Sequence, residues 1–183
     1  EDNDDDNDGM NDTVDDCSIG DLNWISNSST DHDSDGCRDD GTEDNDDDND
    51  GITDQSDNCS AGDLGWISSP ITDYDTDGCQ DSNEDTDDDN DSITDSSDLC
   101  PTGNLNWISN SSTDHDADGC QDSSSEDLDD DNDGMTDLSD SCSNGDLNWI
   151  SNSSTDYDTD GCQDSNEDTD DDNDSITDSS DLC

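Results

Sequence analysis

Apolar residues recur along this chain at long, regular intervals, without the short periods of an amphipathic helix or a strand. Four tryptophans are separated by 42, 41 and 42 residues, and each has a leucine two residues before it and an isoleucine directly after it. The residues between them are mostly Asp, Asn, Ser and Gly, which favour turns and loops. We therefore predict a mostly irregular, loop-built fold, in which short strands are confined to segments beside the tryptophans, such as 22–26.

The acidic blocks between the tryptophans repeat with the same period. They begin at Glu1, Glu43, Glu84, Glu126 and Glu167, with spacings of 42, 41, 42 and 41 residues, and residues 72–100 are identical to residues 155–183. Self-similarity at a fixed period is the signature of a tandem-repeat architecture. We predict a single array over residues 1–183, with repeats 1–42, 43–83, 84–125 and 126–166 and a partial repeat 167–183. We expect it to be a window of a longer protein.

The charge of the chain excludes several classes of partner. It has 61 acidic residues against one arginine, a formal net charge of -60, and only 20% hydrophobic residues. Such a charge repels nucleic acid and anionic membrane surfaces, and no apolar run approaches the roughly 18 residues of a membrane-spanning helix. We expect no nucleic-acid partner and no membrane insertion. This small apolar surface cannot offset the entropy cost of ordering the chain. An ordered fold therefore needs metal ions or disulfides in place of an apolar core.

An aspartate ladder, motif A, precedes the first cysteine of each block. Its copy at 46–57 reads D-x-D-x-D-G-x-x-D-x-x-D, and all five copies have Asp at loop positions 1, 3, 5, 9 and 12. Position 6 requires a left-handed backbone, which suits glycine, so we expect strain where Ser92 and Ser175 replace it. Asp at position 2 leaves room for a second ion, at Asp5, Asp47, Asp88, Asp130 and Asp171. The candidate metal ligands are Asp4, Asp6, Asp8, Asp12 and Asp15; Asp46, Asp48, Asp50, Asp54 and Asp57; Asp87, Asp89, Asp91, Asp95 and Asp98; Asp129, Asp131, Asp133, Asp137 and Asp140; and Asp170, Asp172, Asp174, Asp178 and Asp181.

A second ladder, motif B, runs through the second cysteine of each block. Residues 73–84 read D-x-D-x-D-G-C-x-D-x-x-E, the spacing of an EF-hand loop whose final glutamate binds through both oxygens. In the longer blocks one residue is inserted, so that Glu43 and Glu126 fall at position 13. The candidate ligands are Asp31, Asp33, Asp35 and Asp39; Asp73, Asp75, Asp77, Asp81 and Glu84; Asp114, Asp116, Asp118, Asp122 and Glu126; and Asp156, Asp158, Asp160, Asp164 and Glu167.

Alternating carboxylates followed by a tight turn surround one point with hard oxygens, the ligands that calcium prefers. Nine ladders are in register, with glycine at position 6 in seven of them. They predict at least one Ca²⁺ per ladder, about nine or more in all. A solvated acidic tail is the alternative, but it would give the regular cysteines and tryptophans no role.

Motif A followed closely by a cysteine, as in Asp46–Cys59, resembles the thrombospondin type-3 repeat. The resemblance covers most of each block except the segment around residues 23–30, and it implies calcium-wrapped loops without regular helices or sheets. It also implies disulfides Cys17–Cys37, Cys59–Cys79, Cys100–Cys120 and Cys142–Cys162. The alternative register joins Cys37–Cys59, Cys79–Cys100, Cys120–Cys142 and Cys162–Cys183 and leaves Cys17 free. Regular cysteines in a core-poor chain indicate an oxidising setting, so we expect a secreted protein, extracellular or at the cell surface.

The tryptophan segments and three sequons leave further alternatives open. Each Trp, with its neighbouring Leu and Ile, could form a miniature core under the disulfide or a contact surface between subunits or repeats. Asn27, Asn110 and Asn152 each open an N-S-S sequon that could carry N-linked sugar and make this a glycoprotein. His32 and His115 alternate with tyrosines at position 2 of motif B and are interpreted as packing or surface residues.

No nucleophile, base and orienting group recur together, so the repeats predict no catalytic site and no enzyme. We expect an extracellular structural protein, a calcium-stabilised repeat stalk or filament that self-associates into a fibre or array. The alternative is a disordered or semi-ordered acidic protein that buffers calcium or binds mineral.

Overall fold

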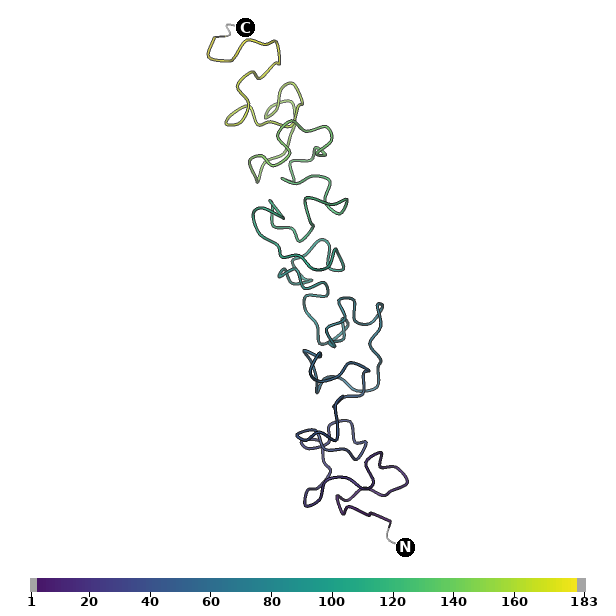
Figure 1. Ribbon diagram of the computed structural model, residues 1–183. Coiled ribbons are helices and arrows are strands. Elements are labelled where there is room, and N and C mark those ends of the chain that lie inside the picture. The colour runs from purple at the N-terminus through teal and green to yellow at the C-terminus, as the bar shows by residue number, and fades with distance from the viewer. Residues whose placement is uncertain (1–2, 181–183) are drawn as a thin grey trace. The chain divides into compact units, whose positions relative to one another are not determined.

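The computed structural model describes residues 3–180, which form turns, bends and loops with no helix and no strand (Figure 1). The chain divides into two compact units, Glu1–Asp88 and Asp89–Cys183, each described by itself below. The predicted irregular fold is confirmed, but the short strands expected beside the tryptophans are not present among the described residues. There the segment makes one backbone bond to motif A, from the Ser26 N–H to the Asp8 carbonyl (2.9 Å), where a strand ladder needs several. None of the described residues belongs to a helix long and apolar enough to span a membrane.

Motifs A and B fold into the same loop. In each, the N–H of position 9 donates to the carbonyl just before position 1, as from Asp54 to Asn45 (3.0 Å) and from Asp81 to Thr72 (3.1 Å). The N–H of position 2 donates to the carboxylate of position 9, at 2.9 Å between Asp47 and Asp54, and the same bond recurs in motif B. The two ladders therefore share one EF-hand-like backbone although their sequences differ at several positions, among them 2, 4, 7 and 12.

Two positions of this loop have a left-handed backbone. Position 4 has a φ between 53° and 65° in all nine copies. Motif A always has Asn there, which tolerates this region, whereas motif B has Ser, Thr or Ala. Position 6 has a φ between 76° and 100°, and Ser92 and Ser175 share this conformation with the glycines, at 85° and 76°. These two serines therefore lie in the region where strain was expected.

The space around position 6 differs between the two motifs. A methyl group added at Gly78 of motif B would lie 2.1 Å from Asp57 Oδ1, whereas nothing lies within 4 Å of the corresponding point at Gly51 of motif A. Position 12 of the first four motif A copies therefore packs against position 6 of the motif B that follows each of them. This contact explains why all four motif B loops have glycine while two motif A loops accept serine.

A disulfide joins the two loops of each full block. The bonds are Cys17–Cys37, Cys59–Cys79, Cys100–Cys120 and Cys142–Cys162, each closing a sequence separation of 20 residues. They confirm the register implied by the resemblance, and the alternative register is wrong; Cys183 lies outside the described residues. Beside the second disulfide, the Asn58 N–H donates to the Asp77 carbonyl and the Ser68 N–H to the Asp50 carbonyl, both at 2.8 Å. The segment between the cysteines thus contacts motif A, and the residue before Cys59 joins motif A to motif B.

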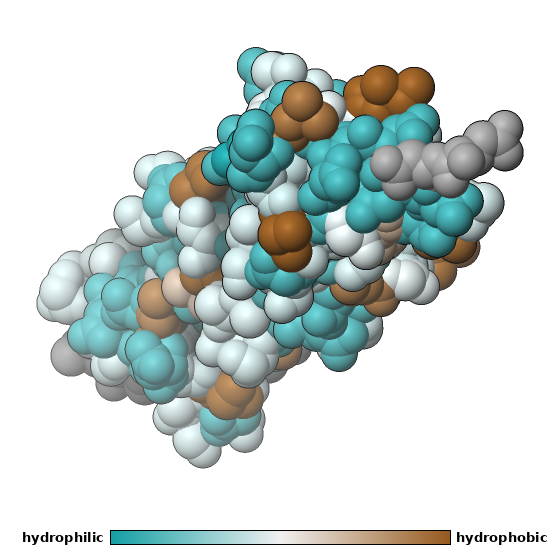
Figure 2. All heavy atoms as spheres, turned by 90° about the horizontal axis from the view of Figure 1, so that it is seen from below, coloured by the Kyte–Doolittle hydropathy of each residue, from teal (hydrophilic) through white to brown (hydrophobic). Residues whose placement is uncertain are grey.

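The interior of the described chain is polar. Its most deeply buried large side chains are all aspartates, namely Asp8, Asp31, Asp48, Asp50, Asp73, Asp89, Asp91, Asp114, Asp131, Asp133 and Asp156. Buried apolar residues are limited to Trp24 and the second cysteine of each block, while Leu22 and Ile25 are 62% and 61% exposed. The miniature-core alternative is therefore reduced to the second cysteine of each block and, in the first block, Trp24. Figure 2 accordingly shows hydrophobic side chains as separate patches on the surface.

Candidate metal centres

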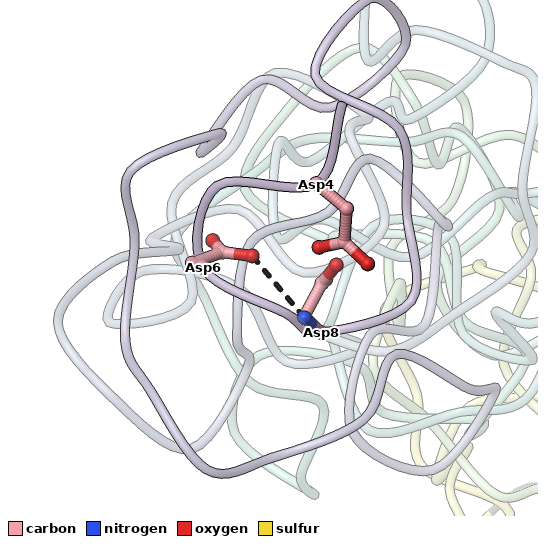
Figure 3. Close-up of side chains that lie close together, drawn as sticks. All are labelled: Asp4, Asp6 and Asp8. Carbon is pink, nitrogen blue, oxygen red and sulfur yellow. Dashed lines mark hydrogen bonds between the residues drawn. The ribbon is translucent and has the colours of Figure 1, made fainter. Parts of the chain in front are cut away.

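The carboxylates at positions 1, 3 and 5 of motif A converge. One oxygen from each of Asp4, Asp6 and Asp8 lies within 4.8 Å of the others, and the second copy repeats this arrangement. Figure 3 shows the three carboxylates on a single loop, with the Asp8 N–H donating to Asp6 Oδ1 (3.2 Å). The tight loop thus brings together three of the five predicted ligand positions of this copy.

Backbone amides hold one oxygen of several ladder carboxylates in a fixed direction. In the second copy, Asp50 Oδ1 accepts the N–H of position 7 (2.6 Å) and Asp46 Oδ2 accepts the N–H of position 6 (3.1 Å). At position 12, Asp57 Oδ1 accepts the N–H of Cys59 (2.6 Å). Each bond fixes the rotation of its carboxylate, so the direction of the other oxygen is fixed as well.

Those other oxygens are buried and have no hydrogen-bond partner. The pattern comprises Oδ1 of position 1, Oδ2 of position 5 and Oδ2 of position 12, found at Asp4, Asp8 and Asp15 and again at Asp46, Asp50 and Asp57. Asp129 and Asp133 of the fourth copy repeat its first two members. A buried charged oxygen without a partner is strongly unfavourable. Three of them at the same positions of a loop are what a bound cation would satisfy, so the residues of motif A fit a metal ion.

Burial, together with repulsion between neighbouring carboxylates, raises the pKa values of Asp50 and Asp57 in the second copy. Burial is the largest cause at Asp57, and together with repulsion from Asp48 and Asp50 it raises the pKa to about 6. Among the described residues one salt bridge forms, between Arg38 and Asp40 (2.5 Å), and Asp40 is not one of the ladder carboxylates. Among the described residues, no cationic side chain therefore offsets the charge of the buried ladder oxygens.

Motif B gathers its carboxylates in the same way but satisfies more of them internally. Oxygens of Asp73, Asp75 and Asp77 lie within 4.8 Å of one another. The fully buried Asp73 accepts the Ser68 hydroxyl at Oδ2 (2.5 Å) and the Asp77 N–H at Oδ1 (3.0 Å). The serine contact recurs in the other blocks as Ser26–Asp31, Ser109–Asp114 and Ser151–Asp156. Motif A, with its unpartnered oxygens, therefore needs a cation more than motif B does.

The glutamate that ends motif B reaches the same place in both block lengths. Glu84, at position 12, accepts the Asp63 N–H at Oε1 (2.6 Å), and Glu43, at position 13, accepts the equivalent N–H of Asp21 (2.6 Å). The residue inserted in the longer blocks is therefore accommodated before the glutamate. The role of this glutamate as an ion ligand stays a prediction.

Sequence reasoning missed groups that orient the ladders from the segment between the cysteines. The serine hydroxyls described above are one such set. A glycine N–H is another: Gly62 donates to Asp48 Oδ2 at position 3 (2.9 Å), and Gly20, Gly103 and Gly145 make the same bond in their blocks. A methyl group added at Gly62 would lie 2.4 Å from Glu84 Oε1. The recurrence of these serines and glycines at fixed places in the period was the signal that could have revealed them.

The two histidines link neighbouring repeats. His32 Nε2–H donates to the Gly62 carbonyl and His115 Nε2–H to the Gly145 carbonyl, both at 2.8 Å. Each bond runs from motif B of one repeat to the tryptophan segment of the next. The interpretation as packing residues is the one that this geometry favours.

The sequon asparagines are exposed, and Asn27 already uses its amide group. Asn27 Nδ2 donates to the Ile25 carbonyl and to the Thr30 hydroxyl, both at 2.8 Å. A sugar on this nitrogen would replace one of these bonds. Glycosylation of the three sequons stays a prediction.

Two candidate copies are described only in part. Asp181, the last predicted ligand of the fifth motif A, lies outside the described residues, and the third motif A is divided between the two units. The first, second and fourth copies therefore carry the geometric argument.

Comparison with protein-family models gives no match for this chain, and comparison with curated proteins gives none either. What the clusters can bind is therefore inferred from their own chemistry. Buried carboxylate oxygens in turns are ligands for a hard cation.

Proposed function

We propose that this chain is an extracellular structural protein in which Ca²⁺ bound to the ladders stabilises the tandem repeats of a stalk or filament. The proposal is supported most directly by the buried, unpartnered oxygens at positions 1, 5 and 12 of motif A. Oxygen ligands on an irregular loop suit Ca²⁺, whereas Zn²⁺ prefers Cys and His, and Mg²⁺ demands rigid octahedral geometry. Millimolar extracellular calcium would fill even weak loops.

A structural role is favoured over a disordered calcium buffer by what the fold buries. Aspartates occupy the interior in place of apolar residues, and each full block is closed by a disulfide. A flexible buffer or mineral binder would need accessible carboxylates, and it would have little need for disulfides. Paired cysteines also fit an oxidising compartment outside the cell.

The exposed apolar side chains give the repeats a surface for self-association. The exposed Leu22 and Ile25, with the buried Trp24 between them, line an open pocket together with Asp6 and Asn7. The equivalent segments line pockets in the second and fourth blocks. Apolar patches repeated at a fixed period suit contacts between copies. A contact that repeats without closing into a ring produces a filament.

Small-angle scattering of the oxidised protein during a calcium titration tests the proposal. In chelator we expect an expanded coil, because the negative charges repel one another. Added calcium should compact the chain, saturating in the millimolar range, and the scattering mass should then exceed that of one chain. A profile that stays coil-like while calcium binds would refute the structural role and favour the acidic buffer or mineral binder.

A further inference from the structure

A third cluster of carboxylates lies between motif B of one repeat and motif A of the next. One oxygen from each of Asp39, Asp44 and Asp47 lies within 4.8 Å of the others. Asp39 is position 9 of motif B, Asp47 is position 2 of the following motif A, and Asp44 lies in the linker between them. We call these three residues, and their equivalents in later repeats, the junction cluster.

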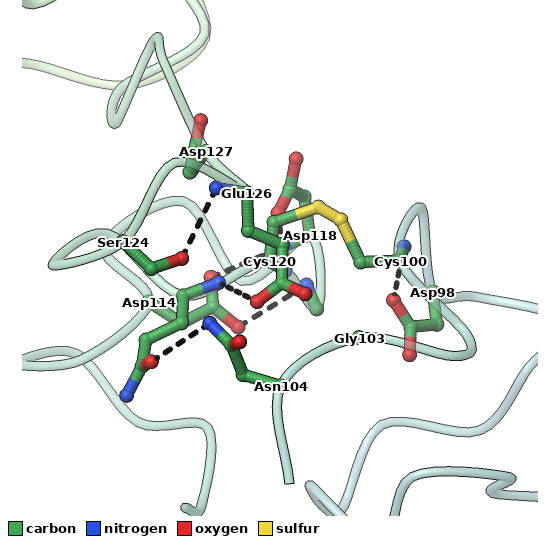
Figure 4. Close-up of a disulfide and its surroundings, with 12 residues drawn as sticks. Asp98, Cys100, Gly103, Asn104, Asp114, Asp118, Cys120, Ser124, Glu126 and Asp127 are labelled. Atoms are coloured by element: carbon green, nitrogen blue, oxygen red, sulfur yellow. Dashed lines mark hydrogen bonds between the residues drawn. A yellow bond between two sulfur atoms is a disulfide. The ribbon is translucent and has the colours of Figure 1, made fainter. Parts of the chain in front are cut away.

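The junction cluster recurs, more deeply buried, in the second unit. Asp122, Asp127 and Asp130 correspond to Asp39, Asp44 and Asp47. Asp127 is 7% exposed and Asp130 is 8% exposed, and the charges of Asp122 and Asp127 both act on Asp130. Figure 4 shows Asp127 directly after Glu126, among the residues drawn around the Cys100–Cys120 disulfide. The junction in the second unit therefore holds two nearly inaccessible carboxylates.

Two oxygens of this cluster are buried without a hydrogen-bond partner. Asp127 Oδ1 accepts the Asp129 N–H (3.0 Å), while its Oδ2 has no partner. Asp130 Oδ2 accepts Asn144 Nδ2–H (2.7 Å), while its Oδ1 has no partner. The same two atoms, Oδ2 of Asp44 and Oδ1 of Asp47, are unpartnered at the first junction. Two junctions in separate units thus leave the same pair of buried anionic oxygens without a donor, and a cation would satisfy both.

We propose that the junction cluster is a further Ca²⁺ site, which joins consecutive repeats. The choice of ion rests on the proposed function. Each ladder ion is held within one loop, whereas the junction ion takes one carboxylate from the preceding repeat and two from the linker and loop that follow. Waters would complete the six to eight oxygens that Ca²⁺ requires. Binding at the junction therefore couples the order of one repeat to that of the next.

Counting bound ions on the full, oxidised chain tests this proposal. Asp127→Asn keeps an oxygen that can accept the Asp129 N–H but removes the charge, and Asp146→Asn removes the same charge from an exposed residue outside the cluster. Native mass spectrometry and equilibrium dialysis should find one Ca²⁺ fewer on Asp127→Asn than on the unaltered chain. Asp146→Asn should bind the full number. The double variant Asp44→Asn/Asp127→Asn should lack two.

Three other outcomes separate the explanations. An ion count on Asp127→Asn equal to that of Asp146→Asn would overturn the junction site, while calcium-dependent compaction in the same samples would leave the proposed function intact. Loss of one ion from both Asp127→Asn and Asp146→Asn would also overturn the junction site, because the change in net charge alone would then explain the lower ion count. An unaltered chain that binds calcium without becoming ordered would refute the proposed function itself. If Asp127→Asn fails to become ordered, Asp44→Asn gives the same test at the less buried junction.

Discussion

At position 4 of the ladder, motif B has residues that are unfavourable in the left-handed backbone conformation found there. The position is left-handed in every copy, with a φ of 61° at Ala117 and 65° at Thr76. A left-handed backbone costs a residue with a Cβ about 1–2 kcal/mol, a cost that Asn reduces through local hydrogen bonds. Motif A, with Asn at this position, avoids most of the cost, so motif B holds more strain than motif A.

Replacing Ala117 by Gly should therefore stabilise the protein. Glycine adopts a φ of 61° without a steric penalty, and we expect the free energy of unfolding to rise by about 1 kcal/mol. Urea unfolding in saturating calcium measures the change. Ala61→Gly is the matched control, because Ala61 is exposed and its φ is not positive. This change should leave the free energy of unfolding unchanged or lower it. Equal effects from the two changes would contradict a strained position 4.

A serine at position 6 should be tolerated in motif A and not in motif B. Gly51 and Gly78 have similar φ values of 100° and 92°, so the conformational cost is shared. Gly51→Ser should lower the free energy of unfolding by about 1–2 kcal/mol. Gly78→Ser adds a steric clash with Asp57 and should lower it by roughly 2–5 kcal/mol. Thermal unfolding in calcium compares them. Equal losses of stability in the two variants would show that position 12 of motif A does not pack against position 6 of motif B in solution.

At the scale of the loop, the sequence was sufficient for the irregular fold and for the convergence of ladder positions 1, 3 and 5, because both follow from fixed local spacing. It could not show that motifs A and B share one backbone, since position 4 is Asn in one and Ser, Thr or Ala in the other. The contact between Asp57 and Gly78 links residues far apart along the chain, and no local pattern encodes it. The sequence also left open whether Leu22 and Ile25 pack inward or face outward; both are exposed, because the interior is filled by carboxylates.

The disulfide should matter most for a loop pair that has no apolar core. Replacing Cys59 and Cys79 by Ser opens a 20-residue separation, and loop-closure entropy gives a loss of about 3 kcal/mol. We expect the second repeat to require more calcium before it becomes ordered, which tryptophan fluorescence during a calcium titration measures. An unchanged titration midpoint would mean that the ions alone determine the loop pairing.

On the scale of the whole molecule, the net charge of -60 makes the calcium-free fold sensitive to protons. Burial, followed by repulsion from Asp54 and other carboxylates, raises the pKa of Asp47 to about 7. Burial and repulsion from Asp118 raise the pKa of Asp116 to about 7 as well. In the unfolded chain both should titrate near the ordinary Asp value of about 3.9. The calcium-free fold therefore binds protons more tightly than the unfolded chain does, so its stability falls as the pH rises through about 7.

Acid should consequently compact the calcium-free chain while it weakens calcium binding. In chelator, lowering the pH from about 8 to about 5 protonates the groups with raised pKa values, removes their repulsion and should reduce the radius of gyration. With subsaturating calcium the same change should release ions, because protons compete for the carboxylate ligands. Scattering and a calcium electrode measure the two responses on one sample. Molar salt at pH 8 is the control, since it screens exposed charges but leaves buried carboxylates ionised. If salt alone compacts the calcium-free chain as far as acid does, surface repulsion and not the buried carboxylates controls its dimensions.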